Sequence, residues 1–184
     1  MRTRRIVFVA GVHGVGKGYL CDRLTSMIDG EHVTASGLIK GRKELGVAKA
    51  ISGIDANQAI LVEELAKFKT TSPFVLLDGH FCLYNQEYEV SSIAPRLFKE
   101  LNVAYIVMIT CAPSVILNRL INRDKNVSNL STTQLEKLQN SEVEHSRLVA
   151  EEINVPITFL DVSGDNLRYL PKLAEMIISY FLTL

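Results

Sequence analysis

Short runs of consecutive apolar residues recur along the chain, and between them apolar positions return every three or four residues. Four of these runs, rich in β-branched side chains, are 6–10, 74–77, 105–110 and 157–162. Each predicts a strand buried on both faces, because neighbouring positions are mostly apolar instead of alternating with polar ones. A weaker run at 32–35 predicts a fifth strand.

The stretches between the runs have the spacing of amphipathic helices. The apolar stripes consist of Leu20, Leu24, Met27 and Ile28; of Ala59, Leu61, Val62, Leu65 and Ala66; and of Val115, Ile116, Leu117, Leu120 and Ile121. Pro113 is expected to open the third of these helices. Ser131 or Thr132 can cap a long helix that ends near Glu152, and Pro171 suits the first turn of a last helix.

Strands that alternate with helices predict a parallel sheet with right-handed crossovers and helices on both faces. We therefore expect one α/β domain over residues 1–184, without linkers or repeats. The stretches 79–90 and 124–131 are rich in Asn, Ser and Tyr and predict long loops, which often bind ligands or act as lids.

Composition narrows the possible partners. The 184 residues are 47% hydrophobic, and twenty basic side chains balance twenty acidic ones. Such a chain has no overall basic field that would favour nucleic acid or an anionic membrane. Its basic start, Arg2, Arg4 and Arg5, precedes an apolar run too short for a signal peptide, so we expect a cytoplasmic protein. No interface stands out, and the oligomeric state stays open.

The three cysteines, Cys21, Cys82 and Cys111, are far apart and lack the paired spacing of metal-binding motifs. An odd number without a secretion signal argues against a disulfide framework or a zinc site. Each is expected to be a reduced, buried, small apolar side chain.

A glycine-rich segment, GVHGVGKG at 11–18, lies between the first predicted strand and a helix. Glycines permit tight turns that let backbone N–H groups surround phosphate oxygens, and the helix directs its positive dipole end toward them. A lysine adds a full charge. The segment predicts a three-layer P-loop NTPase fold with an ATP-binding loop made of Gly11, His13, Gly14, Val15, Gly16, Lys17, Gly18 and Tyr19.

The general phosphate-loop motif has Ser or Thr after its lysine, where this chain has Gly18. The segment resembles the adenylate kinases, which have the same glycine at that position. Their next residue is Thr, whereas this chain has Tyr19, so one hydroxyl contact is lost while the backbone cradle is kept. We expect a modified but working nucleotide site.

The run VLLDGH places Asp78 at the end of a buried strand, where α/β sheets bind ligands. An acid there holds the Mg²⁺ shell through water in phosphate-loop enzymes, and the alternative for Asp78 is to cap the next turn. The D-x-H pattern resembles the second motif of the archaeal-type adenylate kinases. For His80 a substrate-binding role and a structural one are equally open.

The same resemblance assigns roles to further residues by their order along the chain. It implies an acceptor-binding segment at about 34–68, with Lys40 and Gln58 as substrate-binding residues, and a lid at about 119–147. Arg42 and Lys43 could equally form a solvated helix face.

At the lid, Arg119 and Arg123 match arginines that clamp the transferring phosphoryl group, and Arg147 matches one on the returning helix. A surface ion pair with Asp124 or a neighbouring acid is the alternative for the first two arginines.

These residues suit phosphoryl transfer, which requires two anions held in line and the developing charge neutralised. We expect Lys17, Asp78, Arg119 and Arg123 to be catalytic, with ATP and Mg²⁺ as cofactors. The favoured acceptor is a nucleoside monophosphate. Two alternatives stay open. The arginine-poor lid and Lys40 motivate a nucleoside, sugar or other small alcohol as acceptor, and Tyr19 and the same lid motivate an ATP-binding regulatory module.

Overall fold

The computed structural model describes residues 4–44, 54–85, 87–124, 130–164 and 167–183. Its centre is a five-stranded sheet in which every neighbouring pair is parallel. Across the sheet the strands are β2 (Gly30–Thr34), β3 (Phe74–Gly79), β1 (Arg5–Ala10), β6 (Val103–Thr110) and β7 (Ile157–Asp161). All five predicted strands are present, each within two residues of its expected bounds. The prediction that the last one is buried on both faces is wrong, because β7 lies at the edge of the sheet, where its residues are only partly buried and Asp161 is exposed.

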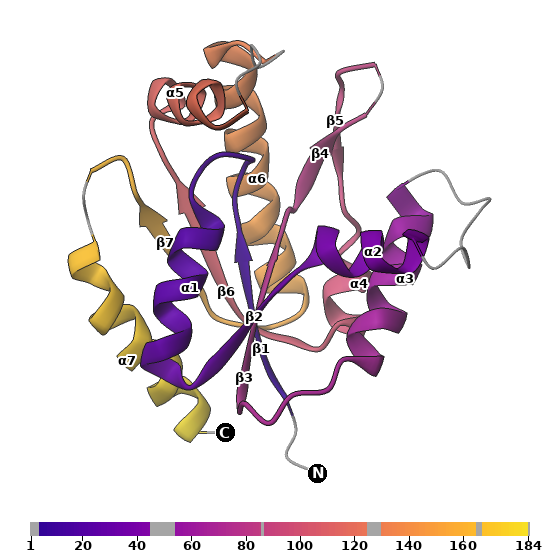
Figure 1. Cartoon of the computed structure of the whole chain (residues 1–184), viewed down its shortest axis with the longest axis vertical. Helices are drawn as coiled ribbons and strands as arrows, with labels where there is room; N and C mark the ends of the chain where they lie inside the picture. Colours follow the sequence, from indigo (N-terminus) through magenta and orange to yellow (C-terminus); the bar gives the residue numbers. More distant parts are fainter. Residues whose placement is uncertain (1–3, 45–53, 86, 125–129, 165–166, 184) are drawn as a thin grey trace.

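Helices cover both faces of this sheet (Figure 1). On one face α1 (Lys17–Ile28) packs beside α7 (Leu170–Leu182), which a 3-10 turn at Leu167–Tyr169 precedes. The other side carries α2 (Ala35–Glu44), α3 (Ile54–Lys67), α4 (Pro95–Glu100) and α6 (Thr132–Glu152), and α5 (Pro113–Asp124) lies beside α6. The expected three-layer P-loop NTPase fold is thus confirmed. None of the helices in the described ranges combines the length and apolar composition that a membrane crossing requires.

Most residues of the predicted helical stripes are buried or partly buried, but four of them, Met27, Ala59, Ala66 and Ile121, are exposed. Leu20, Leu24 and Ile28 lie in the core, whereas Met27 is 44% exposed. The buried stripe of α1 is centred on Leu24 and Ile28 and includes Cys21, so Met27 falls at its edge. Ile121 of α5 is likewise exposed.

The prediction of a loop over 79–90 is wrong in part. Two short strands, β4 (Cys82–Tyr84) and β5 (Val90–Ser92), form an antiparallel hairpin there. The Asn85 side chain organises the turn, because its Oδ1 accepts hydrogen bonds from the backbone amides of Glu87 and Glu89. Three-residue strands are too short to give a periodic signal. Of the other predicted loop, 124–131, residues 125–129 lie outside the described ranges.

The long helix α6 begins as expected at Ser131. Its hydroxyl accepts from the Gln134 amide while the Gln134 side chain accepts from the Ser131 amide, which is a capping box. Further along, the buried Gln139 pairs with both backbone groups of Cys111. This double hydrogen bond fixes the middle of α6 to the carboxyl end of β6, beside the phosphate loop.

Candidate phosphate-binding and acceptor site

The loop between β1 and α1 has a backbone shape that requires its glycines. Gly11, Gly14 and Gly16 all have positive φ, at 150, 83 and 112°. A Cβ atom at Gly11 would lie 2.6 Å from the carbonyl oxygen of Ile109, a distance that no side chain tolerates. Gly16 caps α1 without a side-chain hydrogen bond. The first amides of the helix therefore remain available to an anion.

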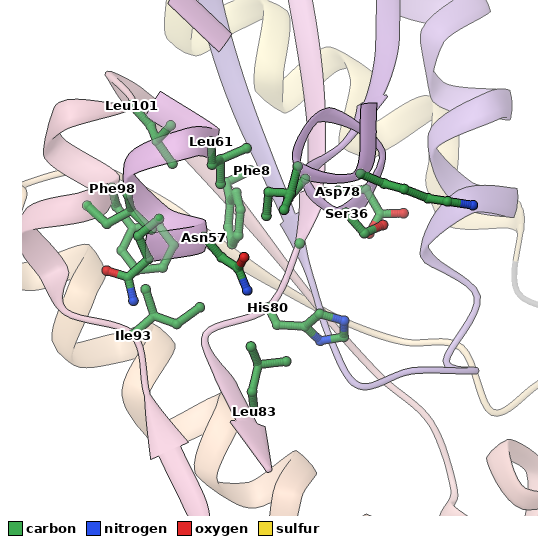
Figure 2. Close-up of a pocket in the computed structure, with 16 residues that line it drawn as sticks. Phe8, Ser36, Asn57, Leu61, Asp78, His80, Leu83, Ile93, Phe98 and Leu101 are labelled. Atoms are coloured by element: carbon green, nitrogen blue, oxygen red, sulfur yellow. The ribbon is translucent and has the colours of Figure 1, made fainter. Parts of the chain in front are cut away.

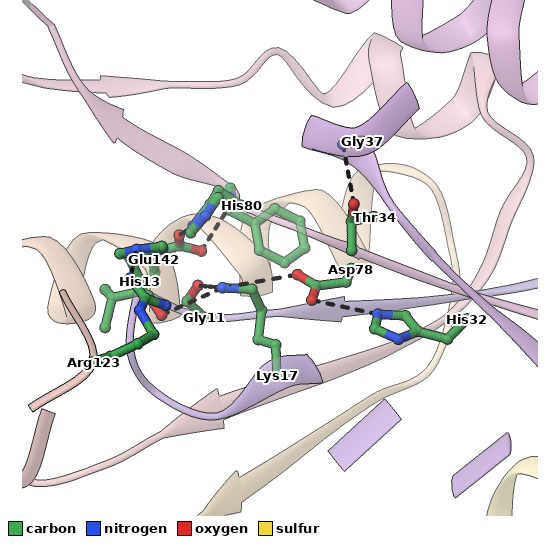
Figure 3. A network of polar contacts seen from close by, with 12 residues as sticks. Gly11, His13, Lys17, His32, Thr34, Gly37, Asp78, His80, Arg123 and Glu142 are labelled. Atoms are coloured by element: carbon green, nitrogen blue, oxygen red, sulfur yellow. Dashed lines mark hydrogen bonds and ion pairs between the residues drawn. The ribbon is translucent and has the colours of Figure 1, made fainter. Parts of the chain in front are cut away.

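Lys17 is 8% exposed and folds back over this loop (Figure 3). Its ammonium donates to the carbonyl oxygens of Gly11, at 2.7 Å, and Val12, at 3.3 Å. It also lies 3.9 Å from Oδ1 of Asp78. Burial lowers the pKa of Lys17, an effect that the Asp78 charge partly offsets. Phosphate oxygens at the loop would give this ammonium stronger partners than neutral carbonyls do.

Two arginines of α5 reach the same loop. Arg119 donates to the carbonyl oxygen of Val15 at 2.7 Å and to that of Val162 at 3.5 Å. Arg123 lies within hydrogen-bonding distance of Nε2 of His13. Because a guanidinium stays protonated, that imidazole nitrogen must be the acceptor. Both predicted arginines thus lie beside the predicted phosphate site, and the side chain of Asp124 lies outside what the structure describes.

Asp78 ends β3 between two cations. Its Oδ1 faces Lys17, while Oδ2 lies 3.5 Å from Nε2 of His32 in β2. The other imidazole nitrogen, Nδ1, lies 2.9 Å from a carboxylate oxygen of Asp22. Together, the interactions with Asp78, Cys21 and Asp22 raise the pKa of His32 to about 10. This role of His32 has no signature in the sequence, because histidines on strands are usually structural.

The residues at the loop fit a magnesium ion held indirectly. The Asp78 carboxylate is 14% exposed and next to Lys17, and carboxylate oxygens with waters are the ligands that Mg²⁺ prefers. Gly18 supplies no hydroxyl, but a Cβ added there would meet only His32, at 3.9 Å. A small side chain therefore fits at position 18.

Beside Asp78 a cavity of about 530 Å³ opens between α2, α3, α4 and the β4–β5 hairpin (Figure 2). Its walls are mostly apolar and include Phe8, Leu61 and Phe98. The polar residues that line it are Ser36, Lys40, Asn57, Gln58, Asp78 and His80. Three residues predicted to bind the acceptor, Lys40, Gln58 and His80, are thus brought together with Asp78.

A buried acid on α6 orients His80. Oε1 of Glu142 lies 3.1 Å from Nδ1 of His80, and Oε2 accepts a hydrogen bond from the Phe81 amide at 2.9 Å. Glu142 is fully buried. An ionised Glu142 can only accept, so Nδ1 of His80 carries the proton and Nε2 is left as an acceptor. Glu142 is not predictable from the sequence, since an acid on a polar helix looks like a surface residue.

Some residues singled out in the sequence do not line the cavity. The guanidinium of Arg147 lies 4.2 Å above the Phe159 ring of β7, and Arg147 is not among the residues that line the cavity. Tyr19 is 55% exposed and contacts the Arg23 guanidinium, so its hydroxyl is on the outer face of α1.

Arg42 makes ion pairs with Glu63 and Glu64, which agrees with the alternative that it belongs to a solvated helix face. The side chain of Lys43 lies outside what the structure describes.

Comparisons with known proteins support the fold. The family model described as "AAA domain" matches residues 10–139. Among curated proteins, none matches the chain by sequence. A gluconokinase from Sinorhizobium meliloti 1021 is similar in structure, with a TM-score of 0.56, 13% identity, and coverage of 98% of this chain and 94% of that one. Shikimate kinase from Acinetobacter baumannii in complex with shikimate gives a TM-score of 0.54, 16% identity, and coverage of 99% and 95%. The similarity is to this broad fold and does not single out the adenylate-kinase type.

Proposed function

Because the chain belongs to the AAA domain family, we propose that it is an ATP-dependent kinase that phosphorylates a hydroxyl group of a small molecule. The observation that carries this proposal is the position of Asp78. The same carboxylate lies 3.9 Å from the loop lysine and lines the 530 Å³ cavity. An acceptor in this cavity therefore lies next to the phosphates of a nucleotide on the 11–18 loop.

The loop side of the site would bind and neutralise the triphosphate. Backbone amides of residues 11–18 surround its oxygens, and Lys17 exchanges the carbonyls of Gly11 and Val12 for phosphate. Arg119 and Arg123, which reach the loop from α5, add positive charge where negative charge develops during transfer. A magnesium ion near Asp78, when bound, would neutralise phosphate charge and orient the β- and γ-phosphates.

The cavity side would supply the proton acceptor. With Nδ1–H of His80 directed to Glu142, Nε2 is free to take the proton of a substrate hydroxyl as its oxygen attacks phosphorus. Asp78 is engaged by Lys17 and His32, which leaves His80 as the better base. A phosphate acceptor has no such need, because its oxygen is already ionised at neutral pH. The His80–Glu142 pair therefore favours an alcohol.

The charged residues that line the cavity also favour an alcohol as acceptor. Among the described residues that line it, Lys40 is the one lysine, and no arginine contributes. A doubly charged acceptor phosphate is usually held by bidentate arginines. The similar structures are a gluconokinase and a shikimate kinase, enzymes named for acceptors other than nucleotides. A nucleoside monophosphate remains the second candidate, because Lys40 and Gln58 line the cavity where the family resemblance places its phosphate.

A coupled assay of ADP release separates these alternatives. The full chain with ATP and Mg²⁺ would be screened against sugars, sugar acids, other alcohols, nucleosides and nucleoside monophosphates. Turnover on an uncharged or carboxylate-bearing alcohol supports the proposal, while turnover on monophosphates alone overturns it in favour of the second candidate. ATP binding without acceptor-dependent ADP release would instead indicate a regulatory module. His80→Gln is the matched variant, since only hydroxyl transfer needs its base.

A further inference from the structure

Three side chains from three elements converge on the α1 side of the sheet. Cys21 of α1, His32 of β2 and Asp78 of β3 each direct one ligand atom to a common place, and these atoms lie within 4.8 Å of one another. Cys21 is fully buried, and His32 and Asp78 are partly buried. Asp78 takes part through Oδ2, the oxygen facing His32, while its Oδ1 faces Lys17. The cluster is therefore adjacent to the phosphate site but on the other side of the carboxylate.

The orientation of His32 is that of a metal ligand. Its Nδ1 is held by the Asp22 carboxylate at 2.9 Å, while the buried Nε2 makes no hydrogen bond in the described structure and has only the ion-pair contact with Oδ2 of Asp78, at 3.5 Å. Histidines that bind metals almost always give their second nitrogen to a carboxylate or carbonyl, which fixes the tautomer and the ring. A distance of 3.5 Å is long for a hydrogen bond, so this buried nitrogen is incompletely satisfied. A cation between Nε2, the Asp78 oxygen and the Cys21 sulfur would satisfy all three ligand atoms.

We propose that Cys21, His32 and Asp78 bind a thiophilic divalent metal ion of the zinc class. Three protein ligands of the N, O and S types leave one position for water, a common tetrahedral arrangement for Zn²⁺. On binding, the thiol of Cys21 and Nε2–H of His32 each release a proton to solvent, and metal–sulfur and metal–nitrogen bonds form. No oxidation is involved.

The ligand atoms of the site favour a zinc-class ion over magnesium. Mg²⁺ prefers oxygen ligands in octahedral geometry, and a thiolate with an imidazole does not meet that preference. The spacing of the cysteines argues against a zinc site, because no two of them are close in sequence. The fold instead brings together one cysteine, one histidine and one acid. Occupation of the site ties Asp78 to the α1 side and so restricts its movement toward the nucleotide.

Cobalt(II) is the probe of choice, because a cysteine thiolate bound to Co²⁺ gives an ultraviolet charge-transfer band and a tetrahedral ion gives strong visible bands. The full chain, reduced and free of metal, would be titrated with Co²⁺. We expect one equivalent to produce both signals, one equivalent of Zn²⁺ to abolish them, and a large excess of Mg²⁺ to leave them unchanged. A parent protein without the thiolate band overturns the proposal.

Matched variants locate the ion. Cys21→Ser and His32→Asn should lose the thiolate band and the tetrahedral spectrum respectively, while Cys82→Ser and Cys111→Ser keep both. Asp22→Asn leaves all three ligands in place and should weaken Co²⁺ binding about tenfold to a hundredfold, as outer partners of metal ligands do. Circular dichroism confirms that each variant is folded, and Cys21→Ala replaces Cys21→Ser if the latter is not. A thiolate band that persists in both Cys21 variants also overturns the assignment.

Discussion

Nδ1 of His80 lies 3.1 Å from Oε1 of Glu142, although 62 positions separate the two residues in the chain. The same carboxylate holds the Phe81 amide with its other oxygen. Helix α6 is thereby fastened to the turn that follows β3, and the imidazole is fixed at the cavity with one known nitrogen free. A residue from the far end of the predicted lid segment thus orients the candidate base.

Replacement of His80 by Gln tests this arrangement. We expect kcat for a hydroxyl acceptor to fall about a hundredfold, because the proton acceptor is lost, with a smaller change in KM. Glu142→Gln should also lower kcat, since an amide can present a donor to Nδ1 and favour the wrong tautomer. Steady-state kinetics measure both, with Glu144→Gln, an exposed acid on the same helix, as control. Unchanged kcat in His80→Gln would contradict the assignment of the base.

Lys17→Ala should lower the rate of phosphoryl transfer about a thousandfold, because a preorganised charge at the transition state is removed. The measurement is acceptor-dependent ADP release at saturating ATP. Lys137→Ala on the exposed face of α6 serves as control. If Lys17→Ala works as fast as the parent protein, the loop lysine has no part in catalysis.

Gly11→Ala should destabilise the fold and weaken ATP binding. Its Cβ would lie 2.6 Å from the Ile109 carbonyl, and its φ of 150° is unfavourable for alanine. We expect a loss of about 1–3 kcal/mol in the free energy of unfolding, measured with urea. Gly41→Ala is the matched control, because no atom lies within 4 Å of an added Cβ in α2. That variant should gain up to about 1 kcal/mol from helix propensity.

His32 should remain protonated well above neutral pH. Its pKa, raised to about 10 by Asp78, Cys21 and Asp22, exceeds the ordinary value of 6.5. The raised pKa stabilises the folded state fully below about pH 6.5, and this contribution is lost as the pH rises toward 10. Imidazole nitrogen shifts in NMR spectra of the metal-free protein would show the charged form at pH 8. Asp22→Asn should lower this pKa, and a neutral ring at pH 8 in the parent would contradict the arrangement.

Gly18→Ser should be tolerated and should strengthen binding of Mg²⁺·ATP. The added Cβ meets only His32, at 3.9 Å, and a hydroxyl at this position reaches the metal in the general phosphate-loop motif. Calorimetric titration of ATP with and without Mg²⁺ measures the effect. Binding that does not differ from that of the parent in the presence of Mg²⁺ would place the ion away from position 18.

The sequence predicted those features that depend on neighbours along the chain. The five strands, the phosphate loop and the Ser131 cap follow from apolar runs, glycines and a hydroxyl at a helix start. The hairpin after β3 could not be predicted, because its strands have only three residues each and carry no periodic signal. Glu142 and His32 act through partners far away in sequence, and their types alone do not reveal burial or pairing. Arg147 matched a family position by order, yet it lies on the ring of Phe159.

The two oxygens of the Asp78 carboxylate face different cations, the ammonium of Lys17 and the imidazole of His32. No other amino acid can direct one acceptor oxygen to each of these two cations from this position. Asparagine would replace one oxygen by a donor and set it against a positive charge on either side, while glutamate would carry both oxygens farther from the strand. Natural variation at position 78 should therefore be confined to aspartate in any chain that also keeps Lys17 and His32.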